Sequence, residues 1–203
     1  HVGDLFSLLR ELGIDDRTLV LFCSDNGAAE RFDGVLDACG PFKGFKKSMY
    51  EGGIRVPLLA RWPGRIPAGS VSNFPCSFPD MLPTLAEAAG IADRVPADVT
   101  GMSILPTLLG QPQASADRHL YWEWPQNDRG ENAFAPEGLM QAVRRGKWKL
   151  LRNSGTVPWE LYDLSTDPGE TRNLADAHLD VVTELLAWVQ ANRVDPRPQA
   201  EPP

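Results

Sequence analysis

Two side chains able to hold a metal ion stand next to each other in the segment LVLFCSDNGAAE, residues 19–30. Asp25 and Asn26 follow an apolar run, and Gly27, which allows a sharp turn, comes directly after them. Both side chains carry hard oxygen donors, which suit Ca²⁺ or Mg²⁺ better than a soft metal. The alternative is an Asx turn that only ends the strand.

A second group able to do chemistry is the run of cations in GPFKGFKKSMYEGGIRVPLLARWPGR, residues 40–65. One acid, Glu51, accompanies the cations, which are Lys43, Lys46, Lys47, Arg55, Arg61 and Arg65. A basic run in a chain of net charge −7 predicts a local anion site. A lysine beside a metal could hold a tetrahedral anion and stabilise charge on its oxygens. A solvated loop whose cations pair with the acidic remainder is the alternative.

The elements that must position these groups follow from the apolar pattern. We expect a helix over 2–12, a buried strand over 19–23, a second strand within 54–64, and a helix that Gly90 ends. A helix followed by a continuous apolar strand predicts an α/β layer with a parallel sheet. In such sheets ligands bind beyond the carboxyl ends of the strands, which is where Asp25 and Asn26 stand.

The second half of the chain has a different pattern. Strand character in 119–124, 138–153 and 159–164, with a turn at Arg145-Gly146, is followed by an amphipathic helix over 178–193. This order predicts a small antiparallel α+β unit. We therefore expect two domains, 1–110 and 111–203, the second ending in a disordered Pro-rich tail.

Composition excludes several classes of protein. No apolar run approaches the length needed to cross a bilayer, so no membrane partner is expected. A pI near 5.0 argues against a nucleic-acid binder. Cys23, Cys39 and Cys76 lack metal-ligand spacing, and we expect free thiols. The chain opens inside a helical pattern without Met, so we expect a piece of a longer protein; the compartment is left open.

The motifs TLVLFCSDNG and GFKKSMYEGGIRVPLLARWPG together resemble the C-terminal half of the type I sulfatase family, within the alkaline-phosphatase-like superfamily. FPDMLPTLAEAAG, GMSILPTLLG, AVRRGKWKLL and WELYDLSTDPGETRNLA follow in family order. The fold implied is the C-terminal part of an alkaline-phosphatase-like α/β sandwich plus a small antiparallel α+β domain.

The resemblance implies roles for particular residues. Asp25 and Asn26 match two ligands of the family's single divalent cation, usually Ca²⁺. Lys46, counted back from YEGG, matches the lysine that contacts the substrate sulfate, with Lys47 and Lys43 as competing choices. Glu51, Gly52, Gly53 and Arg55 are expected to shape the loop. His119 and Glu123 are weaker candidates for the rim of the substrate pocket.

The family nucleophile is a formylglycine, made from Cys or Ser in a C-x-P-S-R-like motif of the N-terminal half. CGPFK at 39–43 only mimics that motif, because it follows the Asp-Asn pair instead of preceding it. We therefore expect the 203-residue chain alone to be inactive. Without the other half, apolar sheet surface would be exposed, which predicts an oligomer or association with the missing part.

The reaction implied is hydrolysis of a sulfate ester on a small molecule or a glycan. One alternative is a phosphodiesterase or phosphonate hydrolase of the same superfamily. There the motif resembles Asp-His-Gly, and His suits Zn²⁺, whereas Asn26 favours one hard cation. The other alternative is a module without catalysis that binds a sulfated glycan through the basic loop.

Overall fold

The computed structural model describes residues 1–32, 36–115, 118–125 and 138–194. The chain forms two compact units, one of residues 1–24 and 57–115, the other of residues 25–56 and 116–203. Arg61 and Arg65 of the basic run therefore fall in the first unit, and the other candidate site residues fall in the second. The expected Pro-rich tail lies almost wholly outside the described residues, and the domain boundary at residue 110 stays a prediction.

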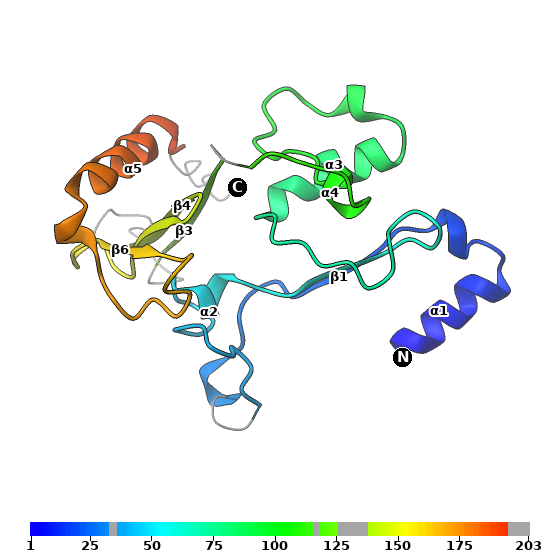
Figure 1. The fold of residues 1–203 in the computed structure, drawn as a ribbon, viewed down its shortest axis with the longest axis horizontal. Helices are drawn as coiled ribbons and strands as arrows, with labels where there is room; N and C mark the ends of the chain where they lie inside the picture. Colours follow the sequence, from blue (N-terminus) through cyan, green and yellow to red (C-terminus); the bar gives the residue numbers. More distant parts are fainter. Residues whose placement is uncertain (33–35, 116–117, 126–137, 195–203) are drawn as a thin grey trace, which may run out of the picture. The chain divides into compact units, whose positions relative to one another are not determined.

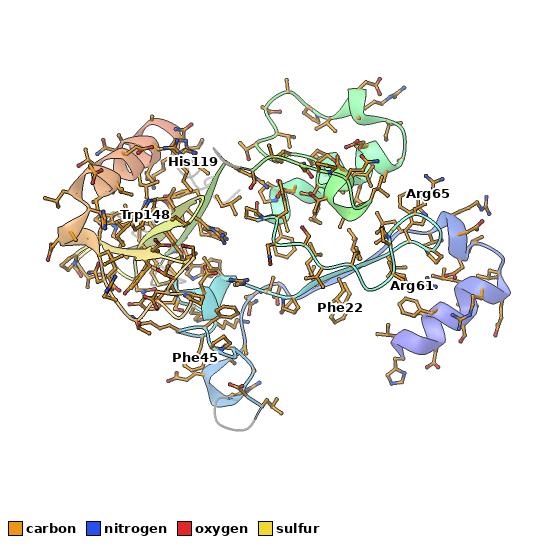
Figure 2. The ribbon with its side chains drawn as sticks, viewed as in Figure 1. Phe22, Phe45, Arg61, Arg65, His119 and Trp148 are labelled. Atoms are coloured by element: carbon orange, nitrogen blue, oxygen red, sulfur yellow. The ribbon has the colours of Figure 1, made fainter. Side chains whose placement is uncertain are left out.

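The first unit holds two strands and short helices (Figure 1). Its elements are α1 (Val2–Glu11), β1 (Val20–Cys23), β2 (Leu58–Arg61), α3 (Met81–Ala88) and α4 (Leu105–Leu108), with 3₁₀ turns at Asp15–Arg17, Phe78–Asp80 and Ala92–Arg94. Arg61 pairs with Asp15 at 2.6 Å, and its guanidinium lies 4.5 Å from the ring centre of Phe6. These contacts fix β2 against α1 and the segment that follows it; Phe22 and Arg61 are labelled in Figure 2.

The expectation of a parallel sheet at this point is wrong for the strands that the structure describes. β1 and β2 form an antiparallel pair, with Val20 opposite Arg61 and Phe22 opposite Leu59. An apolar run predicts which faces of a strand need cover, but it carries no information on the direction of the neighbouring strand. The connection over residues 24–57 brings the chain back in the opposite direction.

The second unit is a four-stranded antiparallel sheet in chain order, β3-β4-β5-β6. Its elements are α2 (Glu51–Ile54), β3 (His119–Pro125), β4 (Leu139–Arg145), β5 (Trp148–Arg152), β6 (Glu160–Asp163) and α5 (Leu179–Asn192), with 3₁₀ turns at Glu30–Phe32 and Ala175–Ala177. Gly146, at φ 55°, occupies the tight β4–β5 turn that Arg145-Gly146 predicts. The antiparallel α+β expectation is confirmed here.

Alternation along the strands gives this sheet two buried faces. One face, which we call the helix face, packs Val143, Leu150 and Leu161 against Leu185 and Val189 of α5. The other face, which we call the loop face, carries the side chains of the alternate strand positions, Ala142, Leu151 and Tyr162. These pack against Met49, in the segment that contains α2, and Leu164 belongs to the same cluster. The sheet therefore lies between α5 and the segment that contains α2.

Two smaller expectations can also be compared with the structure. Cys23, Cys39 and Cys76 are all free, as expected. Among the residues that the structure describes, no helix combines the length and the apolar character that a membrane span needs.

Candidate functional site

The candidate site is built on the glycine-rich loop, which we define as residues 43–53. Met49 is buried against the loop face of the sheet, and Tyr50 packs beside it. The Met49 amide donates to Asn153 Oδ1 at 2.7 Å, at the end of β5. An apolar anchor and a hydrogen bond to a strand end thus hold the middle of the loop on a rigid support.

The strand-end segment with Asp25 and Asn26 is tied to this loop by main-chain hydrogen bonds. Gly27 N donates to Gly53 O at 2.9 Å, and Lys46 N donates to Ala28 O at 2.8 Å. These bonds bring together the two segments that the sequence singled out, although about 20 residues separate them. The backbone of Lys46 is therefore fixed against the turn that follows Asn26.

Three glycines make this close approach possible. A Cβ on Gly27 would stand 1.9 Å from Gly52 O, and one on Gly52 would stand 2.1 Å from Gly44 O. A Cβ on Gly53 would stand 2.2 Å from Ser48 O. All three contacts are with main-chain atoms, which cannot rotate away, so these positions require glycine.

A buried ionic cluster holds the loop at Glu51. Lys149 Nζ lies 2.9 Å from Glu51 Oε1 and 2.8 Å from Glu170 Oε1, and the side chain of Lys149 is 0% exposed. Glu170 Oε2 accepts from Glu51 N at 2.6 Å, although Glu170 has φ 52°, in the left-handed region. Arg55 adds a longer contact of 3.4 Å to Glu51. The expected loop-shaping role of Glu51 has a physical basis in these contacts.

The two carboxyl groups of this cluster have opposite pKa shifts. Burial raises the pKa of Glu51, but the ion pair and hydrogen bond with Lys149 outweigh it, and the net shift is downward. Burial raises the pKa of Glu170, and Lys149 only partly offsets that effect. At neutral pH the cluster depends on the charge of Lys149, because one ammonium faces two carboxyl groups.

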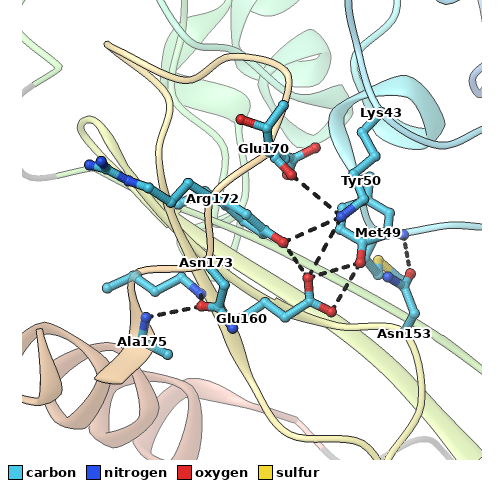
Figure 3. A network of polar contacts seen from close by, with 12 residues as sticks. Lys43, Met49, Tyr50, Asn153, Glu160, Glu170, Arg172, Asn173 and Ala175 are labelled. Atoms are coloured by element: carbon cyan, nitrogen blue, oxygen red, sulfur yellow. Dashed lines mark hydrogen bonds and ion pairs between the residues drawn. The ribbon is translucent and has the colours of Figure 1, made fainter. Parts of the chain in front are cut away.

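A second polar network lies at the start of β6 (Figure 3). Tyr50 OH donates to the carboxylate of Glu160 at 2.9 Å, and Tyr162 OH donates to the same carboxylate. Lys43 Nζ lies 4.0 Å from Glu160 and 4.0 Å from the ring centre of Tyr50. Burial, then the Glu160 contact, raises the pKa of Tyr50 to about 12, so the donor stays protonated.

The predicted ligands and cations lie at the accessible side of the loop. Asp25, Lys46 and Lys47 are exposed, and Asn26 is half-buried. Lys43, one of the competing choices for the sulfate contact, is also exposed, but its Nζ donates to Glu170 O and Tyr162 OH, each at 3.4 Å. This engagement favours Lys46 over Lys43 as the residue that meets an anion.

His119 and Glu123, the weaker rim candidates, point to the helix face. The His119 ring stacks on Trp188 of α5, with ring centres 4.4 Å apart. Glu123 accepts from Arg193 Nε at 2.7 Å and from Tyr121 OH at 2.5 Å. The glycine-rich loop covers the opposite face, so these contacts favour packing roles, and we do not carry either residue into the proposals below.

The donor set at residues 25 and 26 fits a hard cation in its chemistry, because a carboxylate and an amide oxygen are ligands that Ca²⁺ prefers. Nowhere in the described ranges do three or more His, Cys, Asp or Glu side chains group to hold a metal. If Asp25 and Asn26 bind a cation, the remaining ligands would therefore have to come from outside the described residues.

Residues 40–194 match the family described as N-sulphoglucosamine sulphohydrolase, C-terminal, and the chain belongs to this sulfatase family. The chain is 34% identical to N-acetylgalactosamine-6-sulfatase of Canis lupus familiaris, over 87% of the chain and 32% of that protein. It is 32% identical to arylsulfatase A of Homo sapiens, over 91% of the chain and 39% of that protein. The chain thus spans between about a third and two fifths of the length of these relatives.

Solved structures agree on the fold. Ps i-CgsB in complex with k-i-k-neocarrahexaose has a TM-score of 0.77 and 28% identity, over 94% of this chain and 39% of that one. A protein in complex with its substrate D-glucosamine-2-N,6-O-disulfate has a TM-score of 0.70 and 26% identity, over 94% of this chain and 37% of that one. The expected fold class, the C-terminal portion of an alkaline-phosphatase-like fold, is confirmed.

Sequence reasoning missed the partners that support the loop. Nothing local marks Lys149 as fully buried, since it stands in the basic stretch RRGKWK and has the composition of an exposed residue. Glu160 and Glu170 looked like ordinary strand and turn residues. The one available signal was the alternation of side chains along a strand. Lys149 stands between Trp148 and Leu150, so its side chain must point to the face of the sheet opposite to theirs.

Proposed function

We propose that the longer protein containing this chain hydrolyses sulfate esters, on a sulfated small molecule or glycan. The observation that carries the proposal is the pair of main-chain hydrogen bonds that ties the Asp25–Asn26 turn to the Lys46 loop. Membership of the sulfatase family supports it, and so do the ligands of the two structures above, k-i-k-neocarrahexaose and D-glucosamine-2-N,6-O-disulfate.

In this proposal Asp25 and Asn26 hold Ca²⁺, or Mg²⁺, with further ligands from the rest of the protein. The bound cation would neutralise negative charge on the sulfate oxygens. Lys46 places an ammonium beside the same oxygens and stabilises the charge that grows on them. We expect the nucleophile, a formylglycine, to lie in the other part of the protein. The chain alone would therefore not hydrolyse the sulfate ester.

The test uses the purified longer protein with 4-nitrophenyl sulfate and with the phosphate diester bis(4-nitrophenyl) phosphate. We expect the sulfate to be the better substrate and EDTA to abolish its turnover, with Ca²⁺ restoring it. Preference for the phosphate would favour the phosphodiesterase alternative. Binding of a sulfated glycan that EDTA does not weaken, without turnover of either ester, would favour the binding module.

Substitutions separate the three lysines. Lys46→Ala should lower kcat/KM for the aryl sulfate by about 100-fold or more, since removing one donor to a developing anion has that effect in other enzymes. Lys43→Ala and Lys47→Ala should lower kcat/KM for the aryl sulfate by a smaller factor. Arg65→Ala removes the same charge from the same basic segment and is the control. If Lys47→Ala lowers kcat/KM the most, the sulfate contact would have to be assigned to Lys47 instead of Lys46.

A further inference from the structure

An open groove lies on the loop face of the second unit. Its volume is about 520 Å³, within the range of roughly 300–1,000 Å³ typical of ligand pockets. It is lined by the glycine-rich loop and by strand ends of the sheet, through Lys47, Ser48, Tyr50, Trp124, Met140, Asn153, Ser154, Val157 and Glu160. Lys47, which directly follows Lys46, therefore forms part of one wall of the groove.

Trp124 contributes an aromatic ring to the apolar lining of this groove, which also includes Met140 and Val157. Trp124 stands near the end of β3, opposite Met140 of β4, and it is 47% exposed. Trp122, two residues earlier on the same face, packs against the core cluster instead. Because Trp124 lines the groove and is partly exposed, its indole can offer a flat face to the CH side of a sugar ring.

The polar wall is a carboxylate held in place before any ligand arrives. Glu160 accepts from the hydroxyls of Tyr50 and Tyr162, and its side chain is 25% exposed. Asn153 is likewise fixed, because its Oδ1 accepts from Met49 N. Groups whose positions are fixed lose little conformational entropy on binding, and a carboxylate can accept hydrogen bonds from neighbouring hydroxyls of a sugar.

Lys47 adds a cation to the lining of the groove. Its backbone has a conformation that glycine would adopt with less strain. Its φ is 74°, in the left-handed region, where a residue with a Cβ is disfavoured. Strained positions of this kind cluster at functional sites. A lysine held there, lining the groove, provides positive charge for an anionic ligand.

We propose that this groove is a saccharide subsite, in which Trp124 stacks on a sugar ring, Glu160 accepts its hydroxyls and Lys47 pairs with a sulfate substituent. The inference rests on the proposed function, because it makes the substrate a sulfated oligosaccharide whose scissile sulfate lies at Lys46 and whose sugar extends past Lys47.

The test compares two substrates of the longer protein, 4-nitrophenyl sulfate and whichever sulfated oligosaccharide from heparin, chondroitin or carrageenan it hydrolyses best. Trp124→Ala should lower the ratio of the oligosaccharide kcat/KM to the aryl sulfate kcat/KM about tenfold, an effect within the range for truncating a tryptophan that anchors an interface. Lys47→Gly should lower that ratio as well. Trp124→Phe should restore most of it, and Leu179→Ala, at an exposed position on α5, is the control.

A binding measurement makes the test independent of turnover. The ligand is the desulfated form of the same oligosaccharide or, if none is hydrolysed, of the oligosaccharide in the panel that binds best. This desulfated ligand should bind the longer protein, and Trp124→Ala should raise the Kd of that binding. Binding that depends on Trp124 without sulfate hydrolysis would overturn the proposed function and leave the subsite standing. Turnover of the aryl sulfate with no activity on any oligosaccharide, or with no effect of Trp124→Ala, would overturn the subsite.

Discussion

At the scale of single residues, the backbone at Lys47 is the clearest place where stability and function are opposed. A left-handed backbone costs a residue with a Cβ about 1–2 kcal/mol, and glycine avoids that cost but loses about 0.5–1 kcal/mol in chain entropy. Lys47→Gly should therefore stabilise the protein slightly while weakening its interaction with an anionic saccharide.

The stability part of this prediction is measurable by urea unfolding. Lys47→Gly should raise the free energy of unfolding by about 0.5–1 kcal/mol. Lys47→Ala removes the same charge but keeps the Cβ, so it should give no such gain. Equal stability of the two variants would show that the left-handed backbone at residue 47 is not strained.

The tyrosines predict an alkaline transition. The chain has three, and burial together with hydrogen bonds to Glu160 or Glu123 raises the pKa of Tyr50 and Tyr121 to about 12 and that of Tyr162 well above its usual range. A pKa raised in the folded state gives stability that is complete below the unfolded value near 10 and is lost as pH rises above it.

Absorbance at 295 nm measures this directly. In the folded chain, no tyrosinate signal should appear at pH 10, and it should rise only near pH 12 or with unfolding. Denatured protein should titrate near pH 10, about the usual tyrosine value, and serves as the reference. A tyrosine that ionises in the folded protein at the usual value would contradict the Glu160 or the Glu123 network.

At the scale of elements, the contact between the Asp25–Asn26 turn and the glycine-rich loop depends on glycine. Gly27→Ala would place a Cβ 1.9 Å from Gly52 O, so one of the two segments must move. We expect this substitution in the longer protein to lower kcat/KM for an aryl sulfate by at least about 100-fold, because small misplacements at a catalytic centre have effects of that size.

Gly3→Ala is the matched control, since a Cβ there meets nothing within 4 Å and the residue lies in α1. It should leave activity unchanged. A Gly27→Ala protein with full activity would show that the two segments need no close main-chain contact for catalysis.

The buried cluster links the loop to β5 and to the turn at Glu170. Lys149→Met leaves two carboxyl groups without their cation in a buried place, which typically costs about 3–5 kcal/mol. The loss should be smaller at pH 5 than at pH 8, because the unpaired carboxyl groups can then take up protons.

Unfolding by urea at the two pH values measures this loss. A Lys149→Met/Glu170→Gln double variant, which removes one charge of each sign, should recover part of the stability. A single variant that loses the same free energy at both pH values would show that the carboxyl groups of Glu51 and Glu170 do not control the effect.

At the scale of the whole molecule, apolar side chains are exposed over the first unit. Leu5 of α1 is 61% exposed, and the cross-strand pair Phe22 and Leu59 is 57% and 58% exposed. A two-stranded ribbon is marginally stable alone, and its unpaired edges invite further pairing. We expect the isolated chain to self-associate through this surface.

Sedimentation velocity tests that expectation. Replacing both Phe22 and Leu59 by Thr keeps strand preference and removes apolar area, so it should shift the chain toward monomer. Leu179→Ala, at a position 65% exposed on α5, should leave the distribution unchanged. A clean monomer for the unmodified chain would contradict the prediction.

The sequence by itself determined the local elements and the two segments of the candidate site. Period-two and helical patterns predict α1, α5 and the hairpin with Gly146 at its turn, because these depend on neighbours within a few residues. Motif order placed Asp25, Asn26 and Lys46 together. Main-chain hydrogen bonds of Gly27 and Ala28 with the glycine-rich loop bring the two segments together, while the roles of the three side chains stay a prediction.

Only the tertiary structure decided which side chains support or surround that site. Glu51 meets Lys149 across 98 residues of sequence and Tyr50 meets Glu160 across 110, so no local pattern could pair them. The antiparallel partner of β1 and the placement of His119 and Glu123 on the helix face were decided in the same way. The physical reason is that side-chain alternation fixes which residues share a face, while the packing of distant segments decides what that face meets.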